Sequence, residues 1–446
     1  MKLREELEKR GLVYQFTDEK LFDLYEKGGQ KFYCGFDPTA DSLQLGNFVS
    51  FMTAVNFMKR KNTFVLIIGG ATGMIGDPSF KATDRAMLDE KTLRHNQQAI
   101  TKQVQTILEN LKTISGYDFK FEVINNYDFY KDMSIFEFLS SAGKYITVNN
   151  MLSKESVKKR IEDPEMSITY TEFSYMLLQG YDFLTLYEKH KVKLQIGGSD
   201  QRGNMVTGTE MIRKKLGGEA QSFVMTFPLI TDSTGKKFGK SEGNAIFLDP
   251  NKTSPYFAYQ YFMNTTDEDV EKYLKIFTLL DFDTVEEIVN KHKQDPSLRY
   301  GQKQLANYLI STVYGEEAAA QSIKISEILF GQNDKLATIK TMSKYDLLAL
   351  QKETGGINIT IQNSEFIIQD GNIPASKELK VLDLFTQSGL TESNGEAKKL
   401  LASGALYCNE NKVIDLQHIV KKEDFINGAL LLRKGKKQYK LIIYKV

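Results

Sequence analysis

The chain has 446 residues, of which 41% are hydrophobic and 26% charged, as in ordinary soluble globular proteins, and two to three domains are expected at this length. The formal net charge of +1 excludes a protein that attracts nucleic acid over its whole surface. The two cysteines, Cys34 and Cys408, have no metal-ligand spacing, which excludes a disulfide framework or a zinc site and favours a reducing compartment.

The N-terminal residues 1–16, MKLREELEKRGLVYQF, have the pattern of a charged amphipathic helix. No long apolar stretch follows them, so neither a signal peptide nor a membrane-spanning segment is expected. We therefore expect a cytoplasmic protein with no membrane partner.

Strand, glycine turn and helix then recur along the first half of the chain. The predicted strands are KFYCGF, TFVLIIGG and VKLQIGG at residues 31–36, 63–70 and 192–198, and predicted helices lie at 48–61 and 204–217. This succession predicts the α/β class, with a doubly wound parallel sheet of the Rossmann type. In such a sheet, ligands bind at the carboxyl ends of the strands, where these glycine turns lie.

The glycine turn after the second strand carries charges of both signs. Asp77 precedes a proline and is placed to bind an ammonium group. Lys81 and Arg85 follow four residues apart, so on a helix both would point at one anion. The alternative is a surface loop with unrelated charges, and the residues alone leave both open.

Residues 169–190 predict a helix that begins at a capping box formed by Thr169 and Glu172. Its apolar residues form an ordinary core stripe. Tyr175, Gln179 and Asp182 lie on a separate line, where they either line a polar pocket or face solvent. Both interpretations stay open on this pattern alone.

The segment TDSTGKKFGKSEGN, at residues 231–244, places Lys237, Lys240 and Ser241 among glycines after a strand-like run. Flexible lysines in such a loop suit a phosphate group whose charge develops in a transition state. The alternative is the basic tip of a hairpin.

After this segment the residue pattern becomes typical of helices. We expect a Rossmann-type catalytic domain at 1–245, a helical domain at 246–330, a linker region at 331–376 and a small α+β domain at 377–446. The last of these has 13 Lys and Arg against 8 Asp and Glu, a net charge of +5, whereas the rest of the chain has −4. This asymmetry indicates a polyanion bound at one end, or arises by chance.

Five motifs occur in a fixed order: YCGFDPTADSL, GGATGMIGDPS, TEFSYMLLQGYDFL, LQIGGSDQRGN and KFGKS. In this order they resemble those of the bacterial tyrosyl-tRNA synthetases, members of the class I aminoacyl-tRNA synthetases, over nearly the whole chain. The resemblance implies that ATP, with Mg²⁺, converts L-tyrosine to tyrosyl-adenylate, and that the tyrosyl group then moves to the 3′ end of tRNA(Tyr). It implies that the helical domain binds tRNA and that the protein is a homodimer with residues 136–157 at the interface. We expect no metal site formed by protein ligands.

The resemblance also assigns candidate site residues. The catalytic set is Thr39, Gln44, Asn47, Lys81, Arg85, Lys237, Lys240 and Ser241. The tyrosine-binding set is Tyr33, Asp77, Asn126, Tyr175, Gln179, Asp182 and Gln201. The ATP-binding set is Cys34, Gly35, Asp37, Gly46, Gly198, Asp200 and Lys240. The C-terminal domain resembles an S4-type RNA-binding domain, and its tRNA-binding set is Lys398, Lys399, Arg433, Lys434, Lys436 and Lys437.

By this resemblance, Tyr33 and Asp182 bind the phenol hydroxyl of tyrosine. Phenylalanine would leave these buried groups unpaired, which explains its rejection. An indole would not satisfy both groups in the same way, which argues against a sister synthetase for tryptophan.

Several positions depart from the family pattern. Gln44 stands where the first signature usually begins with His, while Asn47 at its end is a common variant. A glutamine amide donates a hydrogen bond of comparable reach but carries no charge, and replacing one donor by another should cost less rate than losing it. Arg202 stands in place of a usual Trp, and Asn394 and Gly395 stand where basic residues are frequent, so weaker tRNA binding by that helix is expected.

These departures motivate an alternative function, a catalytically impaired synthetase-like RNA-binding protein. The complete KFGKS motif and the complete tyrosine pocket argue against it, because a protein without the activity has no need of them. We expect an active enzyme.

Overall fold

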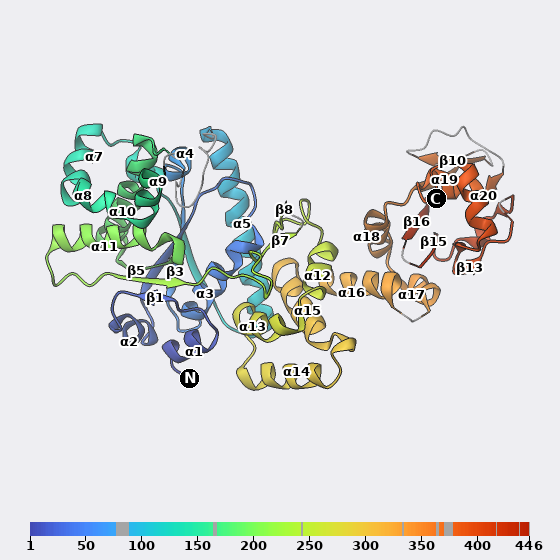
Figure 1. Ribbon diagram of the computed structural model, residues 1–446, viewed down its shortest axis with the longest axis horizontal. Coiled ribbons are helices and arrows are strands. Elements are labelled where there is room, and N and C mark those ends of the chain that lie inside the picture. Colours follow the sequence, from blue (N-terminus) through green and yellow to red (C-terminus); the bar gives the residue numbers. More distant parts are fainter. Residues whose placement is uncertain are drawn as a thin grey trace. The chain divides into compact units, whose positions relative to one another are not determined.

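The computed structural model of the chain divides into two compact units, Met1–Glu316 and Glu317–Val446 (Figure 1). The described residues are 1–76, 89–163, 167–241, 244–331, 334–362, 365–369, 378–415, 417–436 and 438–445. Within these ranges, no helix is both long enough and apolar enough to cross a membrane.

A six-stranded sheet forms the centre of the first unit, in the order β1-β6-β5-β2-β3-β4. Its strands are β1 (Gln15–Phe16), β2 (Lys31–Phe36), β3 (Thr63–Ile68), β4 (Lys120–Asn125), β5 (Val192–Gly198) and β6 (Phe223–Phe227). Strands β2 to β6 pair in parallel, whereas the short edge strand β1 pairs antiparallel with β6. The predicted α/β class is confirmed, as a mixed and mostly parallel sheet.

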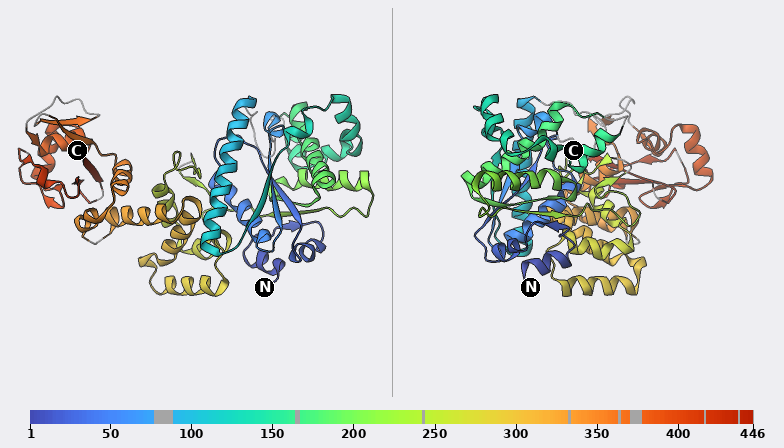
Figure 2. Two further views of the ribbon diagram at one scale, coloured as in Figure 1. Left: turned by 180° about the vertical axis from the view of Figure 1, so that it is seen from behind. Right: turned by 60° about the vertical axis from the view of Figure 1, so that its left-hand side comes forward.

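Helices cover both faces of this sheet (Figure 2). Up to residue 216 they are α1 (Leu3–Lys9), α2 (Lys20–Glu26), α3 (Phe48–Met58), α4 (Thr72–Ile75), α5 (Glu90–Ser115), α6 (Tyr127–Tyr130), α7 (Ile135–Ser141), α8 (Val148–Leu152), α9 (Glu155–Glu162), α10 (Tyr170–His190) and α11 (Arg202–Leu216). Helix α3 is almost wholly buried, including its polar residues Thr53 and Asn56, and this burial holds the turn before it in place. The N-terminal helix is shorter than predicted, because Gly11 follows its end with a φ of 74° and Gln15–Phe16 form β1.

Helix α10 begins at the predicted capping box. The backbone N–H of Glu172 donates to Thr169 Oγ1 at 3.2 Å, and the N–H of Thr169 donates to Glu172 Oε2 at 3.0 Å. Tyr175 and Asp182 are both buried, although they lie on a different line from the apolar stripe. A solvated face is therefore excluded for these two residues.

Helices dominate the last part of the first unit, as predicted. After the short strands β7 (Lys240–Ser241) and β8 (Asn244–Ala245) come α12 (Pro255–Met263), α13 (Asp267–Phe277), α14 (Phe282–Gln294) and α15 (Tyr300–Tyr314). The side chains of Ser254, Thr266 and Asp281 accept backbone N–H groups at the starts of the first three helices. Arg10 is 2% exposed and donates to the carbonyl oxygen of Thr278 at 2.8 Å, which attaches the N-terminal segment to the end of α13.

The second unit contains another six-stranded sheet, in the order β10-β9-β16-β15-β12-β13. Its strands are β9 (Asn358–Gln362), β10 (Glu365–Gln369), β12 (Leu406–Cys408), β13 (Asn411–Lys412), β15 (Ala429–Lys434) and β16 (Gln438–Lys445), with β11 (Leu379–Lys380) and β14 (Ile419–Val420) forming a separate pair. Its helices are α16 (Glu316–Phe330), α17 (Lys335–Thr341), α18 (Lys344–Thr354), α19 (Val381–Gln387) and α20 (Asn394–Ala402). This part is an α+β arrangement, as expected.

The stretch 331–376, which we expected to be a linker region, contains regular structure. Helices α17 and α18 and strands β9 and β10 fall within it, and β9 pairs in parallel with β16. Ile359 of β9 is fully buried in the same apolar core as Phe385 and Leu430. The glycines that suggested a connection instead end short elements, as Gly355 does at the end of α18.

Candidate active site

A cavity of about 420 Å³ opens at the carboxyl ends of β2 and β5, the two strands between which the order of the sheet reverses. Ligands bind at this position in open α/β sheets. The predicted site residues that line the cavity are Tyr33, Cys34, Gly35, Asp37, Thr39, Gln44, Gly46, Asn47, Tyr175, Gln179, Asp182, Gly198, Asp200, Gln201 and Lys237. Members of the catalytic, tyrosine-binding and ATP-binding sets therefore meet in one place.

Some predicted residues are not placed around the cavity. Asp77, Lys81 and Arg85 lie outside the described residues. Lys240 and Ser241 form strand β7, which pairs antiparallel with β8, but their side chains also lie outside the described part of the structure.

Asp182 is a buried acid that lines the cavity. It projects from α10, is 4% exposed, and accepts hydrogen bonds from Tyr130 Oη at 2.7 Å and from Asn126 Nδ2 at 2.9 Å. Burial raises the pKa of the Asp182 carboxyl to about 7, although both hydrogen bonds act in the opposite direction. Asn126 thus lies behind Asp182 and orients it, rather than lining the cavity.

Tyr33, on β2, also lines this end of the cavity. Its hydroxyl is buried and makes no hydrogen bond to any described residue. Burial raises the pKa of Tyr33 well above its ordinary value, and the nearby charge of Asp182 adds to this effect. A buried hydroxyl without a partner costs free energy unless a ligand supplies one, so Tyr33 marks a place for a polar ligand group.

A second polar network lies beside the first, at the end of β2. Asp37 accepts hydrogen bonds from Tyr175 Oη at 3.0 Å and from Thr72 Oγ1 at 2.8 Å. Thr72 in turn accepts one from Asn126 Nδ2 at 3.1 Å. Asp37, which the resemblance assigns to ATP, therefore connects with residues assigned to tyrosine. Gln179 Oε1 is buried beside this network and accepts no hydrogen bond from a described residue.

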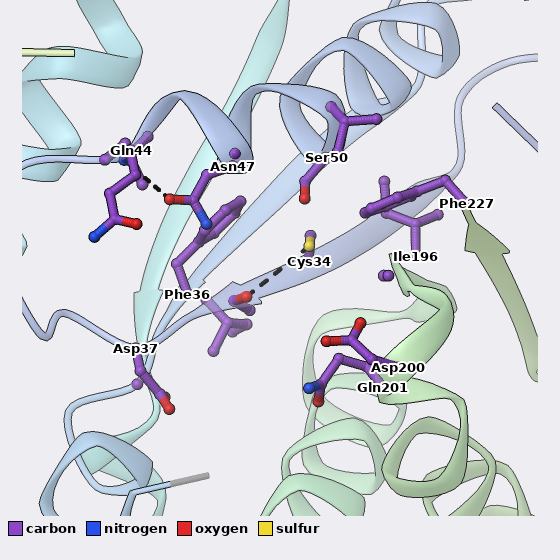
Figure 3. Close-up of a pocket in the computed structure, with 18 of the residues that line it drawn as sticks. Cys34, Phe36, Asp37, Gln44, Asn47, Ser50, Ile196, Asp200, Gln201 and Phe227 are labelled. Carbon is purple, nitrogen blue, oxygen red and sulfur yellow. Dashed lines mark hydrogen bonds between the residues drawn. The ribbon is translucent and has the colours of Figure 1, made fainter. Parts of the chain in front are cut away.

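The opposite end of the cavity is formed by the turn before α3 (Figure 3). The backbone N–H of Gln44 donates to Asn47 Oδ1 at 3.0 Å, and the Gln44 side chain is exposed at the cavity. Figure 3 shows Asp200 and Gln201, at the start of α11, on the other side of the cavity from these two residues. In this part of the cavity the Gln44 side chain is exposed, whereas Asn47, Asp200 and Gln201 are partly buried.

Cys34 lies between the two ends of the cavity. Its side chain is buried, and burial raises the pKa of the thiol to about 12. The thiol is therefore neutral near pH 7 and unsuited to act as a nucleophile. Packing against a ligand is the role that its position fits.

The loop that contains Lys237 closes on the turn before α3. Gly239 has a φ of 83°, and a Cβ atom there would lie 2.7 Å from the backbone nitrogen of Gly46. Gly239 also accepts a hydrogen bond from the N–H of Ile246, whose carbonyl oxygen accepts one from the N–H of Leu45 at 2.8 Å. Only glycine fits this close approach, which brings the KFGKS motif and the first signature together.

Several cavity or near-cavity residues were missed from the sequence, and three of them are polar residues that bear on the site. Tyr130 donates to Asp182, Thr72 donates to Asp37, and Gln195 lines the cavity from β5 with a buried, unpartnered Oε1 among the described residues. Gln195 had a usable signal, a polar residue inside the apolar strand VKLQIGG. Tyr130, four residues after Asn126 on short helix α6, also had one.

The predicted tRNA-binding residues of the second unit differ in their surroundings. Lys398, Lys399 and Lys436 are exposed, whereas Lys437 lies outside the described residues. Arg433 forms an ion pair with a glutamate at 3.1 Å and stacks on the ring of Tyr407 at 3.6 Å. Lys434 also has an internal partner, Glu396, at 2.7 Å. The exposed lysines are therefore the freer candidates for phosphate contacts.

Comparison with known proteins places these features in a family. A family model described as tRNA synthetases class I (W and Y) matches residues 26–331, and a model described as the tyrosine–tRNA ligase SYY-like C-terminal domain matches residues 371–442. A curated tyrosine–tRNA ligase of Streptococcus pyogenes serotype M3 is 42% identical over 446 residues, covering 100% of both chains. One of Streptococcus suis is 43% identical over the same length and coverage.

Two solved structures of tyrosyl-tRNA synthetases are also similar to this chain. The C-terminally truncated mitochondrial tyrosyl-tRNA synthetase of Aspergillus nidulans has a TM-score of 0.66 and 28% identity, covering 74% of this chain and 94% of that one. The corresponding protein of Coccidioides posadasii has a TM-score of 0.64 and 30% identity, covering 73% and 91%.

Proposed function

The chain belongs to the tyrosine–tRNA ligases, within the class I tRNA synthetases, and from this premise we propose how its residues divide the reaction. The ligase activity uses L-tyrosine, ATP and tRNA(Tyr), as the motifs predicted. Neither the tryptophan enzyme nor the impaired RNA-binding protein is supported, because the full-length relatives are tyrosine ligases. The residue roles below are our proposal.

Tyr33 and Asp182 receive the phenol hydroxyl of the substrate. Two features of the cavity carry this assignment. The Tyr33 hydroxyl is buried and has no partner among the described residues, and Tyr130 and Asn126 hold the Asp182 carboxyl in place. A substrate phenol donates to Asp182 and accepts from Tyr33, which satisfies both groups. Phenylalanine fills the same volume but leaves the Tyr33 hydroxyl without a partner and gives Asp182 no hydrogen bond from the substrate.

Tyr175, Gln179 and Asp77 surround the substrate ammonium group, and Gln201 binds its carboxyl end. Asp37, with Tyr175 and Thr72 already bonded to it, adds negative charge on that side. Placement of the ammonium group orients the carboxylate toward the nucleotide, and orientation of this kind supplies much of the rate in phosphoryl chemistry.

In the first step a carboxylate oxygen of tyrosine attacks the α-phosphorus of ATP, and pyrophosphate leaves with the bonding electrons. Gln44, Asn47, Thr39 and Lys237 line the cavity where this charge develops, so they donate hydrogen bonds or positive charge to it. By the resemblance, Lys81, Arg85, Lys240 and Ser241 belong to the same catalytic set. Gly35, Gly46, Gly198, Cys34 and Asp200 bind the nucleoside.

Mg²⁺ enters with the nucleotide in this proposal. Among the described residues, no group of three His, Cys, Asp or Glu side chains is arranged to hold a metal ion. Mg²⁺ commonly binds substrate phosphates through few protein ligands, and the bound ion neutralises their charge. The cavity residues therefore bind the ATP–Mg²⁺ complex and not the ion alone.

In the second step a terminal adenosine hydroxyl of tRNA(Tyr) attacks the tyrosyl carbonyl carbon and releases AMP. We propose that the helices of residues 246–330 and the S4-like domain at 377–446 bind the tRNA. Lys398, Lys399 and Lys436 contact phosphates, and Arg433, Lys434 and Lys437 contribute to the same basic surface. Such contacts make tRNA affinity fall as salt rises.

We also propose a homodimer through residues 136–157 and their neighbours. Phe136 is 82% exposed and Val148 is 60% exposed, with Ile135, Leu139 and Leu152 exposed nearby. Apolar side chains gathered in this way mark protein interfaces. Sedimentation at micromolar concentration should give a dimer, and a monomer would remove this part of the proposal.

The function is tested by ATP–pyrophosphate exchange with tyrosine, phenylalanine and tryptophan as separate substrates. We expect exchange with tyrosine alone. Exchange with phenylalanine at a similar rate would contradict the roles of Tyr33 and Asp182. No exchange with tyrosine, restored by Gln44→His, would mean that the first signature has lost its chemistry.

A further inference from the structure

The loop that carries Lys237 is held by the helices that follow it. The backbone N–H of Ser233 donates to Asp269 Oδ2, on α13, at 2.8 Å. Lys272, on the same helix, donates to the carbonyl oxygen of Thr231. These contacts attach the start of the loop to α13, and a different contact attaches its end.

That different contact is made by Tyr261, on α12. The backbone N–H of Gly239, inside the KFGKS motif, donates to Tyr261 Oη at 3.0 Å. Burial raises the pKa of Tyr261, so its hydroxyl is neutral and accepts this hydrogen bond. The donor lies two residues after Lys237 in the sequence, so this bond helps to fix the backbone next to Lys237.

The ring of Phe238 extends the same attachment. Phe238 is 4% exposed and stacks on Phe277 of α13, with ring centroids 4.4 Å apart and planes 16° apart. The ring of Tyr273 packs edge-on against that of Phe238, with ring centroids 5.0 Å apart. The rings of Phe277 and Phe48, the first residue of α3, also stack, with ring centroids 6.1 Å apart. One aromatic cluster therefore touches the KFGKS motif and the helix that follows the first signature.

We propose that Tyr261 is a positioning residue for adenylate formation. Its hydroxyl holds the Gly239 N–H, and through it holds Lys237 against the first signature turn at Gly46. The aromatic rings provide packing, whereas the hydroxyl adds a directional side-chain hydrogen bond to the backbone hydrogen bonds that Phe238 and Gly239 make with Ile230 and Ile246. This inference rests on the proposed role of Lys237 at the transition state, and the experiment separates the two.

The chain offers a matched control for the hydroxyl. Tyr273 belongs to the same cluster, but its hydroxyl is buried and has no partner among the described residues. Tyr261→Phe and Tyr273→Phe each remove one oxygen from the cluster and keep the ring. Only the first removes a hydrogen bond to the KFGKS motif.

The experiment measures tyrosine-dependent ATP–pyrophosphate exchange for the full-length protein and both variants, with thermal unfolding as a check on folding. For Tyr261→Phe we expect kcat to fall about 3- to 10-fold, the range for one lost hydrogen bond, with the KM for tyrosine unchanged. Tyr273→Phe should stay within about twofold of the unmodified protein in both parameters. Equal effects of the two variants, or a change in tyrosine KM alone, would overturn the proposal.

Hydrogen exchange gives a direct second readout. A peptide that contains Gly239 should lose protection in Tyr261→Phe and keep it in Tyr273→Phe. Unchanged protection in Tyr261→Phe would overturn the proposal even if kcat falls.

A third variant, Lys237→Ala, separates the proposed role of Lys237 from that of Tyr261. If Lys237→Ala retains full pyrophosphate exchange, the proposed role of Lys237 fails. If Lys237→Ala loses pyrophosphate exchange while Tyr261→Phe retains it, only the role of Tyr261 fails.

Discussion

The two ends of the cavity are built in different ways. At the end that we propose binds tyrosine, Asp182 and Asn126 are buried and joined by a hydrogen bond, and the Tyr33 hydroxyl has no hydrogen-bond partner among the described residues. At the end that we propose binds the nucleotide, Gln44 and Lys237 are exposed and lie on a turn and a loop. Buried, preorganised groups discriminate between ligands because leaving them unpaired is costly, whereas exposed groups act on charge that develops during reaction.

This contrast predicts which kinetic parameter each end controls. Changes at the tyrosine end should raise the KM for tyrosine and weaken discrimination. Changes at the nucleotide end should lower kcat and leave tyrosine binding intact.

The largest effect is expected for Asp182→Ala. Removing one partner of a buried, charged hydrogen-bond network costs several kcal/mol, so kcat/KM for tyrosine should fall about 10²- to 10³-fold or more. The measurement is pyrophosphate exchange over a range of tyrosine concentrations, with thermal unfolding to confirm folding. Activity equal to that of the unmodified protein would refute the phenol assignment.

Lys237→Ala should come next, with kcat reduced about 10²-fold and the KM for tyrosine changed by less than about twofold. Lys236→Ala is the matched control, because Lys236 is the exposed neighbour and is not among the residues that line the cavity. Similar losses in both variants would indicate a general effect of loop charge and not a contact made by Lys237.

A smaller effect is expected for Gln44→Ala. Loss of the amide donor should lower kcat about 10-fold, since a neutral donor contributes less than a charged one. Gln44→His should equal or exceed the rate of the unmodified protein. An alanine variant with an unchanged kcat would mean that the first signature acts in this chain without that side chain.

The smallest effect is a shift in pH dependence for Tyr130→Phe. The pKa of Asp182 is about 7, and the substrate phenol favours its ionised form, so tyrosine KM should rise as pH falls below about 7. The hydrogen bond from Tyr130 lowers that pKa, so its removal should move the midpoint to higher pH. Tyr181→Phe, whose ring lies 5.8 Å from Tyr130, is the control. An identical pH profile in Tyr130→Phe would contradict this role.

The sequence predicted strands β2, β3 and β5, because runs such as TFVLIIGG and VKLQIGG are apolar enough to be buried on both faces, but it did not predict β1 or β4. It also placed Tyr175, Gln179 and Asp182 on one line of a helix. Periodicity alone could not say whether that line faces solvent, since the answer depends on the packing of α10 against other elements.

The site residues that could not be predicted from the sequence are those whose partners lie far away along the chain and meet them only in the folded protein. Tyr261 lies 22 residues beyond Gly239 and reaches it through packing of α12 against the loop. Thr72 meets Asp37 because β2 and β3 are neighbours in the sheet. Residues 331–376 resembled a linker because their elements are short and separated by glycine turns, whereas the pairing of β9 with β16 and the burial of Ile359 join this stretch to the C-terminal core.

The most direct test of the contrast is equilibrium binding of tyrosine, measured by calorimetry without ATP, to the unmodified protein, Asp182→Ala and Lys237→Ala. We predict that Lys237→Ala binds tyrosine with unchanged affinity although its kcat for pyrophosphate exchange falls about 10²-fold. Asp182→Ala should show no measurable binding under the same conditions. Tyrosine binding weakened equally by both changes would contradict the division of the cavity into a recognition end and a reaction end.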